Sequence, residues 1–323
     1  VEESPDQVRD NITFDGVELT SHVNGKRMSC GELETPSLAE LRGRVQSGVH
    51  NAGMTGMTSV REIVANVQHL HLDEKNAGSL FQVASQFNLL EMTSPRVTPE
   101  YGVGIYENDL TQGPACAIAA GAGTIYRNYF ATVNGQIGQS ATNQIDCLAD
   151  IGNAMGNSDG HLWKMRNGYA LATESGLIEI LDRLRSSSDS ERDEFRELLR
   201  IGIQWNTQVT LNNALHKVSQ AYCSALPVAY SQHSSSLWSD FAKLILEASY
   251  EATFCAAVLN SRRTGNNTLF LTLLGAGAFG NEMGWIIRAI KRAVDLYREC
   301  GLDVAIVSHG SSKKIIQQLI SDM

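Results

Sequence analysis

Apolar runs and amphipathic stretches alternate through the C-terminal third of the chain. Residues 268–274 are mostly apolar and have the length of a buried strand. Residues 239–259 and 282–300 carry apolar side chains at helical spacing, and Gly301 follows the second stretch as glycine commonly follows a last helical turn. A further strand is predicted over 302–308. This alternation predicts an α/β layered fold with a largely parallel or mixed sheet.

In the rest of the chain, shorter segments have apolar residues spaced as in helices or as in strands. Alternation over residues 12–19 predicts a hairpin or edge strands, and Pro36-Ser37 is a typical start for the helix that follows. Short buried strands are predicted at 81–85 and 222–230. Helices are predicted at 59–70, 112–130, 136–148 and 194–203.

The composition is that of a folded protein. The chain has 323 residues, of which 43% are hydrophobic and 19% charged, with 28 Gly and only 6 Pro. These values exclude a disordered chain, a collagen-like repeat and a disulfide-stapled miniprotein. Composition does not shift enough along the chain to indicate a linker. We therefore expect one domain over 1–323, with 1–60 as an N-terminal extension packed on the core.

The charge and the cysteines narrow the classes of partner. A formal net charge of −9 argues against a nucleic-acid groove, which needs clustered Lys and Arg, but not against a small anion held by backbone N–H groups. The sequence contains no run of 18 apolar residues, so no membrane span is predicted. Six scattered cysteines without a C-x-x-C pair predict reduced thiols, a cytoplasmic protein and no metal site. They are Cys30, Cys116, Cys147, Cys223, Cys255 and Cys300.

A glycine-rich segment follows the predicted strand 268–274. Its sequence, Gly275-Ala276-Gly277-Ala278-Phe279-Gly280-Asn281, precedes a predicted helix, a place where a bent backbone can direct several N–H groups at an anion. The spacing also fits the dinucleotide motif G-x-G-x-x-G, but the next strand ends without the carboxylate that would bind a ribose, and too few strands follow. A tight turn without a ligand is the alternative.

Acidic and amide side chains gather before the predicted helix 112–130. Glu107, Asp109 and Gln112 come shortly before or at the helix start, and Gly113 leaves its backbone N–H uncovered. Amide and acid side chains suit ribose hydroxyls, while a helix start suits phosphate. The alternative is ordinary N-capping of the helix by Asp109 or Thr111.

Other polar residues have structural explanations that are at least as good. A surface loop explains Ser231, His233 and Asp240, and no G-x-S-x-G elbow supports a serine hydrolase. His69 and His71 alternate in an apolar context, which favours a structural role. Buried pairing or solvent exposure is preferred over catalysis for Glu251.

Three longer stretches carry a family resemblance. Residues 81–92, 111–117 and 126–130, together with the glycine segment 275–281, resemble a divergent macrodomain family related to poly(ADP-ribose) glycohydrolase and to bacterial effectors of the MavL type. The resemblance spans about residues 12–310. It implies a macrodomain-like three-layer α/β/α core with a mixed sheet and additional helices, and an ADP-ribosyl hydrolase without a redox cofactor or other cofactor.

The resemblance also implies roles for single residues. Glu107 or Asp109 would act on the oxocarbenium-like transition state or activate water, and Gln112 would orient the ribose or the water. Asn88 would hydrogen-bond a distal ribose hydroxyl, and Phe279 would lie against that ribose. The implied ligand-binding set is Gln86, Asn88, Gly113, Pro114, Ala115, Gly275, Ala276, Gly277, Ala278, Phe279, Gly280 and Asn281.

The sequence departs from the glycohydrolases at one place. Their Gly-Gly-Gly and Gln-Glu-Glu signature is absent between Asn88 and Gln112. The catalytic acid and the preference for polymer are therefore open, and so is a non-catalytic module that only binds ADP-ribose. A nucleotide-dependent oxidoreductase is a third hypothesis. The expected partner is ADP-ribose or an ADP-ribosylated protein, in the host cytosol if the protein is a secreted effector. No oligomeric state is predicted.

Overall fold

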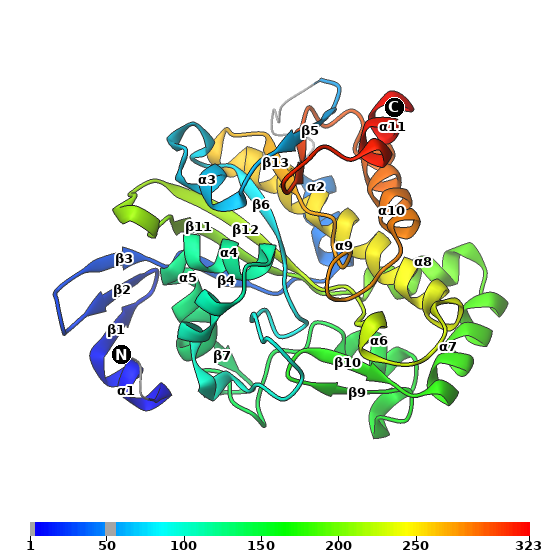
Figure 1. Cartoon of the computed structure of the whole chain (residues 1–323), viewed down its shortest axis with the longest axis horizontal. Coiled ribbons are helices and arrows are strands. Elements are labelled where there is room, and N and C mark those ends of the chain that lie inside the picture. The colour runs from blue at the N-terminus through cyan, green and yellow to red at the C-terminus, as the bar shows by residue number, and fades with distance from the viewer. Residues whose placement is uncertain (1–3, 49–55) are drawn as a thin grey trace.

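A seven-stranded mixed sheet forms the centre of the computed structural model, which describes residues 4–48 and 56–323 (Figure 1). The strands from β12 to the edge strand β5 all run parallel, whereas β11 is antiparallel to both of its neighbours. In spatial order the strands are β4 (Glu32–Glu34), β11 (Gly202–Gln208), β12 (Lys217–Cys223), β6 (Leu80–Ala84), β13 (Thr268–Leu271), β14 (Asp303–Ser308) and β5 (Ser59–Val64).

Helices cover both faces of this sheet. Successive side chains of a strand point to opposite faces. In β6 the ring of Phe81 stacks on His71 of helix α3 (Val67–Leu72), whereas Gln82 donates a hydrogen bond to Thr253 of helix α9 (Ser235–Thr264). Helices α3 and α9 therefore lie on opposite faces, and the core has three layers.

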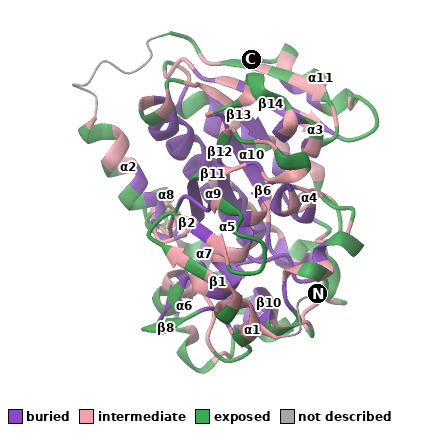
Figure 2. Cartoon of the chain, turned by 90° about the vertical axis from the view of Figure 1, so that its left-hand side faces the viewer, coloured by how far each residue is buried: buried purple, intermediate pink, exposed green. Residues whose placement is uncertain are grey.

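The long helix α9 organises one of these layers. Residues are buried along it from Trp238 to Ser261, and Figure 2 shows burial concentrated on the central strands and this helix. It packs with α2 (Leu38–Ser47), α7 (Glu174–Ser186), α8 (Asp189–Glu197) and α10 (Met283–Leu296). The opposite layer includes α3, α4 (Gln112–Ala119) and α5 (Gly121–Ile125), while α11 (Lys314–Ser321) packs on α10 and β5.

Smaller elements surround the core. Strands β1 (Ile12–Asp15), β2 (Glu18–Ser21) and β3 (Arg27–Ser29) form an antiparallel sheet beside α1 (Pro5–Asn11). Two hairpins are β7–β8 (Thr132–Val133, Gln136–Ile137) and β9–β10 (Trp163–Arg166, Tyr169–Ala172). Short helical segments are α6 (Ala149–Ala154), the π-helical Tyr126–Phe130, and 3-10 turns at Glu74–Asn76, Pro99–Tyr101, Val103–Asn108, Asn157–Asp159, Leu211–Asn213 and Val228–Tyr230. No helix of the described residues has the length and apolarity to cross a bilayer.

Most sequence-based elements are confirmed. The α/β fold with a mixed sheet is present, the hairpin over 12–21 forms, and Ser37 caps α2 through a reciprocal pair of hydrogen bonds with Glu40. The predicted helix 112–130 is helical except at Ala120, and it divides into α4, α5 and a π-helical turn.

Three predicted helices are wrong in whole or in part. Residues 59–64 form strand β5, because their backbone pairs with β14 and their β-branched side chains suit a sheet edge. Residues 136–148 are a short strand and a loop, in which Gln139 donates side-chain hydrogen bonds to the carbonyls of Asn88 and Arg127. The helix predicted to end at 203 stops at Glu197, and β11 begins at Gly202.

Burial of His71 predicts acid sensitivity. Because the Val67 carbonyl can only accept, Nδ1 of His71 carries the proton (2.8 Å) and Nε2 accepts from Gln220 (3.1 Å). Complete burial lowers the pKa of His71 to about 4. The unfolded chain, with an ordinary histidine pKa near 6.5, then binds more protons than the folded chain between about pH 4 and 6.5. The contribution of His71 to stability is complete above that window and is lost as the pH falls through it.

Urea unfolding at several pH values tests this contribution. At about 1.4 kcal/mol per pH unit, it amounts to at most about 3 kcal/mol between pH 6.5 and 4. We expect His71→Gln to flatten the dependence of the unfolding free energy on pH in this window, whatever its effect at neutral pH. His69→Gln, on the exposed side of the same helix, is the matched control and should leave the slope unchanged. Equal slopes for wild type and His71→Gln would refute the assignment.

Candidate functional site

A cavity of about 300 Å³ opens where strands β6 and β13 separate. Strand β13 pairs with β6 only at Leu80 and Phe81, although β6 continues to Ala84. The side chain of Gln112 fills the edge that is left free: its Oε1 accepts from the Ala84 N–H and its Nε2 donates to the Gln82 carbonyl, both at 2.8 Å. A crevice at the carboxyl ends of parallel strands is the usual ligand site of such sheets.

Loops that are far apart in the sequence line this cavity. They follow β6, β12 and β13 or precede α4, and Tyr169 of β10 completes the lining. The lining residues are Ala84, Ser85, Gln86, Glu91, Met92, Thr93, Asp109, Thr111, Gln112, Gly113, Pro114, Tyr169, Ala225, Tyr230, Thr272, Leu273, Leu274, Gly275, Gly277, Ala278 and Phe279. The start of α4 and the glycine segment thus border one space.

The start of α4 offers backbone donors to the cavity. Thr111 precedes the helix without a side-chain capping bond. Within the described parts of the chain, the N–H groups of Gln112 and Gly113 have no acceptor. A Cβ atom on Gly113 would lie 2.1 Å from the Ala84 carbonyl oxygen and 2.2 Å from Oε2 of Glu91, so only glycine fits here. These free donors carry the partial positive charge of a helix start.

The glycine segment offers donors from the other side. It folds on itself through hydrogen bonds from the Asn281 N–H to the Gly275 carbonyl (2.9 Å) and from the Gly280 N–H to the Gly277 carbonyl (3.0 Å). In residues 4–48 and 56–323, no group accepts from the N–H of Gly277, Ala278 or Phe279. Successive free N–H groups in a turn form a concave site for anions.

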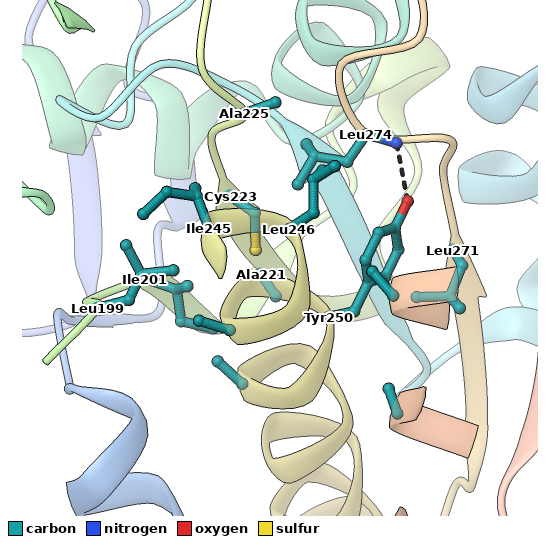
Figure 3. Close-up of a cluster of buried hydrophobic side chains, with 14 of the residues drawn as sticks. Leu199, Ile201, Ala221, Cys223, Ala225, Ile245, Leu246, Tyr250, Leu271 and Leu274 are labelled. Carbon is teal, nitrogen blue, oxygen red and sulfur yellow. Dashed lines mark hydrogen bonds between the residues drawn. The ribbon is translucent and has the colours of Figure 1, made fainter. Parts of the chain in front are cut away.

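A buried tyrosine fixes the entry to the glycine segment. The Tyr250 hydroxyl, on α9, donates to the Thr272 carbonyl (2.8 Å) and accepts from the Leu274 N–H (2.9 Å), the contact drawn in Figure 3. Around it lie apolar side chains of α9 and the central strands (Figure 3). The loop after β13 is therefore tied to the most buried helix of the protein.

Glu91 is a carboxyl group with an unusual environment. Its residue is only 2% exposed, yet it lines the cavity, and its Oε1 atom is buried without a hydrogen-bond partner. Burial raises the pKa of Glu91 to about 8, although the nearby charge of Arg127 and a hydrogen bond with Ser85 act in the opposite direction. Glu91 is therefore protonated at neutral pH and can donate a proton.

Asp109 lies on the same cavity in a more polar setting. Its Oδ1 accepts from the Thr111 N–H at 2.8 Å, and the residue is half-buried. Its negative charge contributes to the raised pKa of Glu91. Two carboxyl groups in one cavity with environments this different are the arrangement that separates an acid from a base.

Three aromatic rings pack together at the cavity. The ring centroids of Tyr169, Tyr230 and Phe279 are 5.0 to 5.6 Å apart. The Tyr169 hydroxyl donates to the Met92 carbonyl (2.6 Å), and burial raises its pKa. Tyr230 is 38% exposed, so this aromatic cluster has one face toward solvent.

Nine of the residues singled out in the sequence line the cavity. They are Gln86, Asp109, Gln112, Gly113, Pro114, Gly275, Gly277, Ala278 and Phe279. Gln112 lies there with its amide bonded to β6, and Gln86 accepts from the Met92 N–H at 2.7 Å. The predicted roles of these residues toward a ligand stay predictions.

The other six candidates are outside the lining. Glu107 is exposed on the 3-10 turn Val103–Asn108. Asn88 is fully buried and bonds Gln144 (2.9 Å) and the Leu90 N–H (3.1 Å), so its amide supports the turn after β6. Asn281 donates to the Leu226 carbonyl (2.8 Å). The remaining three are Ala115, Ala276 and Gly280.

Glu91 is not among the site residues predicted from the sequence. A signal was present, because Leu89-Leu90-Glu91-Met92 places one acid in an apolar run directly after a predicted strand. A carboxyl group in such a run is either paired or functional.

Several lesser candidates serve the structure. Glu251 bonds Arg42 and Arg292, which confirms the buried-pairing interpretation. Ser231 accepts from the Trp238 indole, and neither lines the cavity. Across the described ranges, no three His, Cys, Asp or Glu side chains are grouped to hold a metal ion.

No family model and no curated protein matches this chain. Among solved structures it is similar to poly(ADP-ribose) glycohydrolase from Deinococcus radiodurans in complex with ADP-ribose, with 10% identity, a TM-score of 0.49, and coverage of 90% of this chain and 94% of that chain. It is also similar to poly(ADP-ribose) glycohydrolase from Thermomonospora curvata bound to the inhibitor ADP-HPD, with 9% identity, a TM-score of 0.42, and coverage of 95% and 93%.

Proposed function

We propose that this protein is an ADP-ribosyl hydrolase that binds an ADP-ribose unit in the cavity between β6 and β13. The observation that carries the proposal is the meeting of two sets of free backbone donors with two unlike carboxyl groups in one cavity. The donors come from Gln112–Gly113 and from Gly277–Phe279, and the carboxyl groups are Glu91 and Asp109.

The donors suit a diphosphate. Among the described residues that line the cavity there is no Lys, Arg or His, so an anion there would be held by N–H groups and by the helix start of α4. Two nearby carboxylates would repel a diphosphate. Because burial keeps Glu91 neutral at pH 7, the cavity carries less negative charge than its composition indicates.

The two carboxyl groups suit glycosidic cleavage. As the bond at the anomeric carbon breaks, protonated Glu91 donates its proton to the leaving group. The Asp109 carboxylate stabilises the oxocarbenium-like centre and takes a proton from the attacking water. The products are free ADP-ribose and the released acceptor. This assignment gives the acid role to Glu91, and exposed Glu107 takes no part.

Calorimetry and turnover test the proposal together. We expect free ADP-ribose to bind with micromolar affinity, about 8 kcal/mol. We expect release of ADP-ribose from modified protein, and substrates linked through Arg, Glu, Asp or Ser identify whether the N- or the O-glycosidic bond is cleaved. Absence of binding would overturn the proposal. Binding without release from any of these substrates or from polymer would support a module that only binds ADP-ribose.

A further inference from the structure

The turn that presents Glu91 has a strained backbone. Leu89 adopts φ 65°, which is uncommon for a leucine. Its side chain occupies space that exists because residue 202 is glycine: a Cβ atom on Gly202 would lie 2.4 Å from Leu89 Cδ1. Since Glu91 is two residues further along, the shape of this turn sets the direction in which its carboxyl group points.

Arg127 holds this turn from inside the protein. It is 1% exposed, and its Nε donates to the Leu89 carbonyl at 3.1 Å. Its Nη2 donates to the Thr124 hydroxyl at 3.0 Å, and its guanidinium lies 3.7 Å from the centre of the Tyr222 ring. Within the described chain it forms no ion pair at bonding distance. A buried cation without a bonded anion is costly, which points to a use for its charge.

Atoms of Arg127 and Glu91 that lack hydrogen-bond partners indicate what the charge of Arg127 acts on. Nη1 of Arg127 and Oε1 of Glu91 are both buried without a hydrogen-bond partner. The positive charge of Arg127 acts on Glu91 against the effect of burial. The other ionisable groups that face Glu91 are Asp109, Cys116, Tyr106, Tyr169 and Tyr222, and none of these is a cation.

We propose that Arg127 is a positioning residue for Glu91. It holds the Leu89 turn so that the carboxyl group faces the cavity, and its charge helps that group release its proton to a leaving group. After each turnover Asp109 passes the proton it took from the attacking water to solvent, and solvent reprotonates Glu91. Arg127 does not line the cavity and so acts through Glu91 and not on the substrate. This inference rests on the proposed hydrolase function.

The pH dependence of turnover tests the role. In wild type, activity should fall above about pH 8 as Glu91 loses its proton. We call this fall the alkaline limb of the pH–activity profile. In Arg127→Met we expect the alkaline limb to shift to higher pH by about one unit, and kcat at pH 7 to fall by about 100-fold. The Kd for free ADP-ribose should change by less than about threefold. Arg127→Lys, which keeps the charge, should return the limb toward its wild-type position.

Two further variants keep the test decisive. Tyr222→Phe retains the ring beneath the guanidinium and is the matched control, so its alkaline limb should stay in place. If Arg127→Met does not fold, Thr124→Val replaces it. This substitution removes the hydroxyl that accepts from Nη2 and should lower kcat several-fold at unchanged KM.

The failure of this inference differs from the failure of the proposed function. If wild type releases ADP-ribose but the alkaline limb is unchanged in Arg127→Met, or kcat is unchanged in Thr124→Val, the positioning role is overturned. A wild-type protein without turnover would instead overturn the hydrolase itself.

Discussion

Glu91→Gln is expected to lower kcat for ADP-ribose release by about 10²- to 10⁴-fold, the usual contribution of a positioned acid. Glutamine keeps the volume of the side chain and can still form hydrogen bonds, but it has no acidic proton to transfer to the leaving group. Free ADP-ribose should therefore still bind with nearly the wild-type Kd. Turnover of modified protein and calorimetry on the same preparation measure the two effects.

The same substitution is expected to alter the pH dependence of stability. Glu91 has a folded pKa of about 8 and a reference value of 4.5, so the folded protein binds more protons than the unfolded chain between these values. Its contribution to stability is complete at low pH and is lost as the pH rises through this window. At about 1.4 kcal/mol per pH unit this loss of unfolding free energy is at most about 5 kcal/mol, and Glu91→Gln should not show it.

Glu107→Gln is the matched control for both measurements. Glu107 is exposed and outside the cavity lining, so neither turnover nor the pH dependence of unfolding should change. Full turnover in Glu91→Gln, or its loss in Glu107→Gln, would show that the acid has been assigned to the wrong residue.

Gly113→Ala should damage binding and catalysis together. The new methyl group would overlap the Ala84 carbonyl and Oε2 of Glu91, so either the start of α4 or the Glu91 side chain must move. We expect ADP-ribose affinity to fall by about 10- to 100-fold, or about 1.4 to 2.8 kcal/mol, and kcat to fall as well. Overpacking should also cost about 1 to 3 kcal/mol of unfolding free energy. Calorimetry and urea unfolding measure these changes.

A glycine elsewhere provides the comparison for Gly113→Ala. Gly43 lies within helix α2, and a Cβ atom there would have no heavy atom within 4 Å. Gly43→Ala should leave ADP-ribose binding unchanged and raise stability by about 0.4–1 kcal/mol. Wild-type affinity in Gly113→Ala would mean that the start of α4 does not contact the ligand.

Strands β6, β13 and β14 and the two loops were within reach of the sequence because their signals are local. The strand predicted over 222–230 is wrong beyond Cys223, where β12 ends, and Val228–Tyr230 is a 3-10 turn. Residues 268–274 are an apolar run, and the glycines that follow are a visible change in composition. Edge strand β5 was missed because its apolar spacing also fits a helix, and pairing with β14 decides between them.

The acid that we propose, Glu91, could not be found from the sequence because its environment depends on contacts that no local pattern contains. Glu91 acquires its character from Arg127, Asp109 and burial, which come from separate segments of the chain. Asn88 was expected at a ribose, but its partner Gln144 lies 56 residues away, and that contact places its amide in the supporting turn.

The amide of Gln112 imitates a peptide group along the free edge of β6. With one acceptor and one donor in register, it bonds the strand as a neighbouring main chain would. Without it, the Ala84 N–H and the Gln82 carbonyl would be left without these partners inside the sheet, where an unpaired backbone group is costly. The back wall of the cavity beside β6 is thus a side-chain amide that does not titrate, while the carboxyl groups of Glu91 and Asp109 lie elsewhere in the lining.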